Sequence, residues 1–214
     1  NQNNQIHLYL YVINFQNLFK DYVSKNTFVL LFLKPVFKAL DLLQDLITDK
    51  SEISENTVEV FSAGEEFDYL WERSKNTYEN TNIRNSEAIN WQCFSKKDSK
   101  KLLFGYFEKE KLRGFVVYNS VTTENSRMLV LNDIWGLNLD SSILKDFYLA
   151  AKQYGKKNGY DVILFNSFNE KQNQLLSKMR YFKRRKNDLR FYKSNIDLEE
   201  GSSYLSLLQG DYGL

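Results

Sequence analysis

The sequence predicts an α/β (α+β) fold with a mixed, mostly antiparallel sheet, a central βαβ unit flanked by helices, and a helical N-terminal segment. Two apolar stretches, at residues 128–135 and 160–165, are rich in strand-forming residues. Between them, apolar residues recur at helical spacing at Ile143, Phe147, Ala151 and Tyr154. Strand, helix and apolar strand in this order predict parallel strands joined by a crossover helix. We therefore expect a ligand near the carboxyl ends of both strands, around residues 135–139 and 166–169.

Composition limits the classes of function. The 214 residues, 43% of them hydrophobic, suffice for one full domain with an appendage or for two small domains. A net charge of +2 is too small to create a long-range electrostatic potential that would attract DNA. The chain has one cysteine, Cys93, and one histidine, His7, which predict neither an internal disulfide nor a metal site. No signal-peptide pattern and no apolar run of about 18 residues is present, so we expect a cytoplasmic chain without a transmembrane segment. The missing initiator methionine suggests a fragment or a processed chain.

Residues 1–57 are predicted to form an N-terminal strand and a helical linker before the main domain at residues 58–214. Residues 7–13 alternate in the manner of a strand. Residues 14–49 are predicted to be helical with an interruption near Pro35, which suits the first turn of a helix. Beyond Pro35 the apolar face of the helix is broad, so we expect protein to cover it. The main domain, a second copy or an upstream half could do so.

Up to residue 194, the main domain is predicted to follow the order β-α-α-β-β-β-α-β-α-β-β, and one edge strand comes after it. A short polar helix follows the second strand of the βαβ unit. The other expected elements are a strand at 58–62, helices at 64–76 and 86–94, a hairpin at 102–107 and 112–121, a second hairpin at 180–184 and 189–194, and an edge strand at 203–208.

Four short strings point to a known group of enzymes: FDYLW at 67–71, RNSEAINWQ at 84–92, LNDIW at 131–135 and QGDYG at 209–213. Together with the order of elements, they resemble the GNAT superfamily, and more narrowly the GNAT-like N-acyltransferases found with polysaccharide-biosynthesis enzymes, in which two halves are often fused. The resemblance covers the main domain. It implies transfer of an acyl group from an acyl thioester of the acyl-CoA type to an amine on a small molecule or glycan, such as an amino sugar. It also implies that the N-terminal strand closes an upstream GNAT-like half; a homodimer is the other arrangement.

The resemblance places the acyl donor at the turn after the central strand. Superfamily members that use acetyl-CoA grip its pyrophosphate with a glycine-rich turn at a helix N-terminus. The corresponding cofactor-binding residues here are Gly136, Leu137, Asn138, Ser141, Ser142 and Asn169. Only the first of them is glycine, and Asp140 stands where phosphate would come. Leu176 occupies the position of the superfamily's tyrosine acid and cannot donate a proton, so the acid lies elsewhere or the donor is not acyl-CoA.

Asp133, on an otherwise apolar strand, is the candidate catalytic residue. It could act as general base for an incoming amine, bind an ammonium group, or simply pair with an Arg or Lys. Candidate substrate-binding residues are Trp135, Arg84 and Asp211. Trp135 could stack on a sugar or lie in the core, and Arg84 could hold a carboxylate or phosphate, cap a helix or pair with Glu87. Asp211 could reach the site or belong to a frayed terminus.

Three functions are therefore open. The first is an N-acyltransferase. The second is a catalytically degenerate domain that acts as a binding or pairing module, which Asp140 and Leu176 favour. The third is an aminoacyl-tRNA-dependent aminoacyltransferase, in which basic residues between Lys178 and Lys193 contact RNA phosphates.

Overall fold

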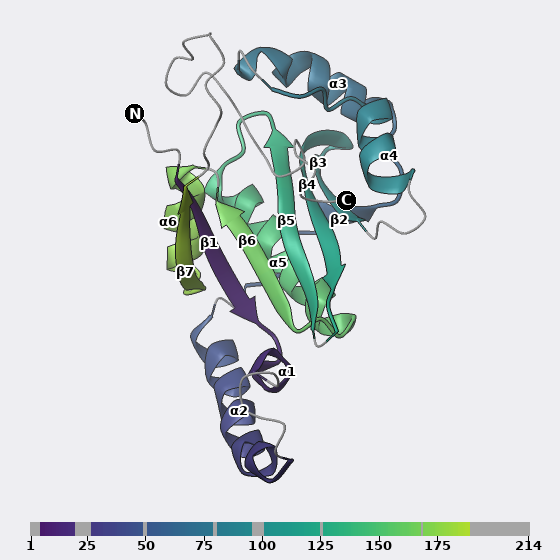
Figure 1. Cartoon of the computed structure of the whole chain (residues 1–214). Coiled ribbons are helices and arrows are strands. Elements are labelled where there is room, and N and C mark those ends of the chain that lie inside the picture. The colour runs from purple at the N-terminus through teal and green to yellow at the C-terminus, as the bar shows by residue number, and fades with distance from the viewer. Residues whose placement is uncertain are drawn as a thin grey trace.

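A computed structural model describes residues 5–19, 27–48, 51–78, 81–95, 101–124, 126–167 and 169–188. Its centre is a seven-stranded sheet in the order β2-β3-β4-β5-β6-β1-β7 (Figure 1). The strands are β1 (Gln5–Val12), β2 (Thr57–Val60), β3 (Lys101–Glu108), β4 (Lys111–Thr122), β5 (Arg127–Gly136), β6 (Val162–Ser167) and β7 (Phe182–Asp188). Neighbouring strands are antiparallel except β5 and β6, which are parallel. The predicted fold class, a mostly antiparallel mixed sheet around a βαβ unit, is confirmed.

Helices cover both faces of the sheet. They are α1 (Phe15–Phe19), α2 (Thr27–Ile47), α3 (Glu65–Ser74), α4 (Ser86–Phe94), α5 (Ser141–Lys157) and α6 (Glu170–Lys178), with a 3-10 turn, η1, at Lys75–Thr77. Helix α5 joins β5 to β6 and packs Phe147 and Ala151 against one face of the sheet. Helices α3 and α4 pack Phe67 and Ile89 against the other face. Helices α1 and α2 lie beyond the end of β1 (Figure 1), and Asp45 of α2 contacts Lys156 of α5.

The N-terminal strand lies inside the sheet. β1 pairs antiparallel with β6 through Tyr9 and Phe165, and with β7 through Tyr9 and Lys183. Tyr9 and Tyr11 are each 1% exposed. The expectation that this strand closes an upstream half therefore differs from the structure, in which it pairs with β6 and β7 of its own chain. The domain boundary at residue 57 stays a prediction, but it does not separate β1 from the main sheet.

Helix α2 differs from the prediction at Pro35. This residue was expected in a first turn, but the helix runs through it from Thr27 to Ile47. Proline removes one backbone bond to the carbonyl four residues earlier. Apolar residues nevertheless continue at helical spacing on both sides of it, so the helical register is kept. The expected strands at 189–194 and 203–208 lie outside the described residues.

Candidate functional site

Strands β5 and β6 diverge toward their carboxyl ends (Figure 1). Their parallel ladder pairs Met128, Leu129 and Val130 with Val162, Ile163 and Leu164, and no later pair is formed among the described residues. Immediately beyond the ladder, Asn166 Nδ2 donates to the Leu131 carbonyl oxygen at 2.9 Å. Beyond Val130, β5 forms no further ladder pair with β6 in the described part of the chain, so the two strands open toward residues 132–136. We call this opening the β5–β6 wedge.

A side chain in the wedge wall lacks a hydrogen-bond partner. Asn132 is the extra residue of a bulge, because Val117 pairs with Asp133 and the next residue of β4, Tyr118, pairs with Leu131. Its side chain is 2% exposed, and its Nδ2 has no partner within the described structure. A buried amide donor without a partner is uncommon and calls for an explanation.

The turn after β5 does not form a phosphate cradle. Asp140 is the N-cap of α5, and its Oδ1 accepts hydrogen bonds from Ser142 N at 2.8 Å and Ile143 N at 2.9 Å. These N–H groups are the ones an anion at the helix N-terminus would need. Leu137 N is likewise engaged, because it donates to the Arg113 carbonyl oxygen. The residues present therefore do not fit the pyrophosphate of a CoA donor.

The other predicted donor residues have structural roles in this turn. A Cβ added at Gly136 would lie 2.6 Å from the Arg113 carbonyl oxygen and 2.7 Å from Gly114 Cα, so this glycine permits close packing of β4 and β5. Asn138 adopts a positive φ of 55°, which asparagine tolerates better than most residues. Ser141 and Ser142 form the exposed first turn of α5.

The first turn of helix α6 contacts the turn that follows β5. Asn169 caps it, accepting from Gln172 N at 2.9 Å. Lys171 Nζ donates to the Leu139 carbonyl oxygen, which links α6 to the turn before α5. Leu176 is 0% exposed and belongs to the core, so no proton donor stands at that position.

Asp133 is paired with Arg84. Arg84 Nε lies 2.8 Å from Asp133 Oδ2, and Nη2 lies 3.4 Å from Oδ1. Arg84 Nη1 also donates to Thr81 Oγ1 at 2.5 Å and to the Asn82 carbonyl oxygen at 2.8 Å. The two charged side chains are 0% and 1% exposed. An amine can reach Asp133 only if the α3–α4 layer moves, so its catalytic role stays a prediction.

The environment of Arg84 differs from its expected alternatives. Asn85, not Arg84, caps α4, accepting from Ala88 N at 2.9 Å. The carboxylate partner of Arg84 is Asp133 on β5 rather than the neighbouring Glu87. Local sequence could not reveal this pair, because its members are 49 residues apart.

Trp135 lies in the core of the same layer. It is 3% exposed, and its Nε1 donates to Ser74 Oγ at 2.8 Å. The Arg84 guanidinium carbon lies 4.3 Å from its ring centroid, and Trp71 and Tyr78 rings flank it at 5.8 Å. A sugar does not reach this ring in the described arrangement. Asp211 lies outside the described residues, and its role stays a prediction.

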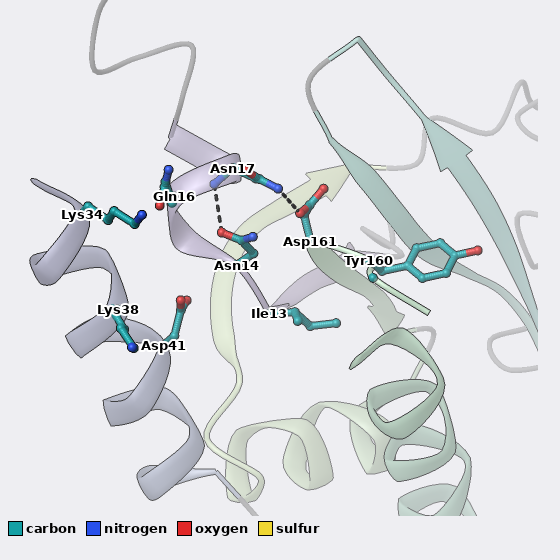
Figure 2. Close-up of a pocket in the computed structure, with 10 residues that line it drawn as sticks. Ile13, Asn14, Gln16, Asn17, Lys34, Lys38, Asp41, Tyr160 and Asp161 are labelled. Atoms are coloured by element: carbon teal, nitrogen blue, oxygen red, sulfur yellow. Dashed lines mark hydrogen bonds between the residues drawn. The ribbon is translucent and has the colours of Figure 1, made fainter. Parts of the chain in front are cut away.

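A hollow of about 490 Å³ lies at the opposite end of the sheet, between α2 and the start of β6 (Figure 2). Asp161 in its wall accepts from Asn17 Nδ2 and Arg127 N, each at 2.8 Å. Burial raises the pKa of the Asp41 carboxyl, against the lowering effect of its bond from Phe15 N. Sequence reasoning missed this hollow because it joins segments far apart in the chain. Its lining residues are Ile13, Asn14, Gln16, Asn17, Lys34, Lys38, Asp41, Gly159, Tyr160 and Asp161.

The described residues contain neither a candidate membrane span nor a candidate metal site. None of the helices in this part of the chain is both long enough and apolar enough to cross a membrane. The same residues contain no group of three or more His, Cys, Asp or Glu side chains placed to hold a metal ion. The basic cluster between Lys178 and Lys193 lies mostly beyond the residues whose side chains are described, so the tRNA hypothesis stays a prediction.

Comparison with known proteins gives structural neighbours only. No family model matches the sequence, and no curated protein matches it. A GCN5-related N-acetyltransferase from Anabaena variabilis is similar over 68% of this chain and 37% of its own, with 13% identity and a TM-score of 0.47. A ribosomal-protein-alanine N-acetyltransferase from Brucella melitensis biovar Abortus is similar over 68% of this chain and 100% of its own, with 10% identity and a TM-score of 0.44.

An aminoglycoside acetyltransferase from an uncultured soil sample, solved in complex with trehalose, is a further neighbour. It is similar over 67% of this chain and 99% of its own, with 14% identity and a TM-score of 0.46. The present chain thus spans well under half the length of the Anabaena protein and nearly all of the length of the other two.

Proposed function

We propose that this chain is an N-acyltransferase domain that transfers an acyl group from a thioester to an amine at the β5–β6 wedge. The acceptor class that we propose is an amino sugar of a polysaccharide precursor. The observation that carries the proposal is the opening between the parallel strands β5 and β6 beyond Val130, where their described ladder ends. An extended, amide-bearing thioester arm can enter such an opening between two strands.

The wedge offers donors for the reacting group. A backbone N–H group that the thioester reaches on this edge of β5 would polarise its carbonyl and stabilise the oxyanion that forms from it. Asn132 Nδ2, buried without a partner beside this edge, supplies a further donor for a polar ligand. Binding of a carbonyl there would account for an otherwise costly orphan group.

Acyl transfer at this site does not need a protein acid. The amine nitrogen attacks the carbonyl carbon and forms the C–N bond, and the C–S bond then breaks with its electron pair on sulfur. A thiol has a pKa of about 8.5, so the thiolate leaves without being protonated first. The burial of Leu176 at the expected acid position is compatible with this route. The amine loses its proton to solvent or to Asp133, if Arg84 releases that carboxylate.

The capped turn sets a limit on the donor. Because Asp140 occupies Ser142 N and Ile143 N, a thioester should be held by its arm rather than by a pyrophosphate. Acetyl-pantetheine, which lacks the pyrophosphate, should then bind within about threefold of acetyl-CoA. A site that used the helix N-terminus for phosphate would favour acetyl-CoA far more strongly.

The test is calorimetric titration of the chain with both thioesters, followed by detection of amide product with amino sugars. Asn132→Leu should lose binding while its unfolding temperature stays equal or rises, because the substitution removes a buried unpaired donor. Gln153→Leu, which replaces an amide at an exposed position of α5, serves as the matched control. Absence of binding by both thioesters would contradict the assignment.

The second candidate function is a non-catalytic binding or pairing module. The N-cap by Asp140 and the buried Arg84–Asp133 pair favour it, because both consume groups that an enzyme would keep free. Thioester binding without amide formation, over a panel of amino sugars, would support the module. Turnover that Asp133→Asn abolishes in the folded protein would support the enzyme and assign the base.

A further inference from the structure

Helix α2 turns its polar side toward the rest of the chain. Gln44 and Thr48 are 2% and 3% exposed. Asp45 accepts from Lys156 Nζ at 2.7 Å, and the Asp41 carboxylate accepts from the backbone of α1 at 2.9 Å. Tyr11 of β1 also donates to Asp45. These polar contacts fix the rotation of the helix about its axis.

The opposite, apolar side of α2 faces outward. Its exposed side chains range from 37% to 77% exposed and are Phe32, Val36, Leu40, Leu42, Leu43, Leu46 and Ile47. We call them the α2 stripe. Taking full side-chain areas of about 150–200 Å², these fractions amount to roughly 700 Å² of exposed apolar surface. A typical monomer exposes patches of about 300–600 Å², whereas a standard interface buries about 800 Å² on each partner.

The α2 stripe matches itself about a two-fold axis. Phe32 and Ile47 are equidistant from the midpoint between Ala39 and Leu40, and so are Val36 and Leu43. All six positions of this set, Ala39 and Leu40 included, are exposed. An antiparallel pair of α2 helices crossing at that midpoint would set Phe32 against the partner's Ile47 and Val36 against the partner's Leu43. Such reciprocity is what a two-fold contact between identical chains requires.

We propose that a second copy of this chain docks on the α2 stripe, forming a homodimer through antiparallel packing of the two α2 helices. Helix α2 lies beyond the end of β1 (Figure 1), and its Asp41 and Asp45 make the contacts with α1 and α5 described above, while the α2 stripe stays exposed. A lipid surface fits less well. The charges on this part of the helix are Lys34, Lys38, Asp41 and Asp45, which cancel, whereas interfacial membrane helices carry an excess of cations.

The test is sedimentation velocity of the full chain from about 1 to 100 µM. Wild type should be mainly dimeric at the upper concentrations. Leu43→Glu places a charge near the centre of the contact in both copies and should weaken the dimer by at least about 100-fold. Lys34→Glu, an exposed change on the same helix but off the stripe, should leave the dimer intact. Circular dichroism checks that both variants are folded.

A cysteine scan then tests the register. Ala39→Cys should form an interchain disulfide readily, since the axis lies between residues 39 and 40, whereas Lys34→Cys should not. The native Cys93 is 2% exposed and gives a low background. A monomer at all concentrations, a dimer that Leu43→Glu does not affect, or equal cross-linking of both cysteine variants would overturn the proposal. Binding of a monomer to vesicles of phosphatidylcholine and phosphatidylglycerol would overturn it in favour of a lipid surface.

Discussion

Replacing Arg84 with methionine would leave the Asp133 carboxylate buried without its cation. Both side chains are almost fully enclosed, with 1% and 0% exposure, and two hydrogen bonds join them at 2.8 and 3.4 Å. Removing one partner of such a pair costs about 3–5 kcal/mol, because the remaining charge keeps its desolvation penalty. The loss of stability should lie toward the upper end of this range, since Arg84 also donates hydrogen bonds to Thr81 and to the Asn82 carbonyl oxygen.

Urea unfolding followed by tryptophan fluorescence measures this cost, because Trp135 lies against the Arg84 guanidinium. With a slope of about 2–3 kcal/mol per molar, the midpoint should fall by roughly 1–2.5 M. The double variant Arg84→Met/Asp133→Leu removes both charges and should recover most of the loss. Asp133→Leu alone provides the fourth corner of the cycle.

A loss below about 1 kcal/mol in Arg84→Met would refute the inference that the pair is enclosed. So would a double variant as unstable as the worse single one, because that outcome would assign the effect to packing rather than charge. The same data are needed before any activity of Asp133→Asn is interpreted, since that variant weakens the pair as well.

Three further predictions follow from other contacts. Asp140→Ala removes the α5 N-cap and should lower stability by about 1 kcal/mol, seen as a fall of about 2–4 °C in unfolding temperature. Asp140→Asn should keep most of the stability that the cap provides, because asparagine caps a helix about as well as aspartate. Burial raises the pKa of the Cys93 thiol from its ordinary 9.0 to about 12, so stability should fall as pH rises from about 9 toward 12. In the native protein this thiol should react slowly with a disulfide reagent at about pH 8, and in denaturant it should react fully. Burial acts to raise the pKa of the Asp45 carboxyl, but bonds from Lys156 and Tyr11 outweigh it and hold that pKa below its usual range. The resulting stability is present above the ordinary pKa of 3.8 and is lost as pH falls, so the stability difference between wild type and Lys156→Met should shrink in acid.

The βαβ unit was predictable because its signals are local. The apolar run that becomes β6, the helical spacing that becomes α5 and the hairpin of β3 and β4 each involve residues close in the chain. The local sequence also predicts that the turn before α5 does not bind phosphate, since the carboxylate of Asp140 stands two residues before Ser142. The structure adds the reason, which is that Asp140 caps the helix with the same N–H groups.

The candidate site was less predictable because its contacts are long-range. Asp133 was singled out as a lone polar residue in an apolar strand, but nothing near it in sequence identified Arg84 as its partner. The hollow beside α2 combines residues 13–17, α2 and residues 159–161, and no periodic pattern joins them. The orphan amide of Asn132 exists only because a bulge in the β4–β5 pairing sets its position.

The sequence by itself determined most of the segments that become strands and helices in the described chain, though not the continuation of α2 through Pro35, since hydrophobic period, capping residues and turns act over a few neighbours. It also determined that α2 has a broad apolar side. Only the tertiary structure decided that β1 lies between β6 and β7, that Asp133 is closed off by Arg84, and that α2 points its apolar side outward. Each of these depends on pairing between residues far apart in the chain. A one-dimensional pattern shows that an apolar or charged group needs a partner, but folding in three dimensions selects that partner.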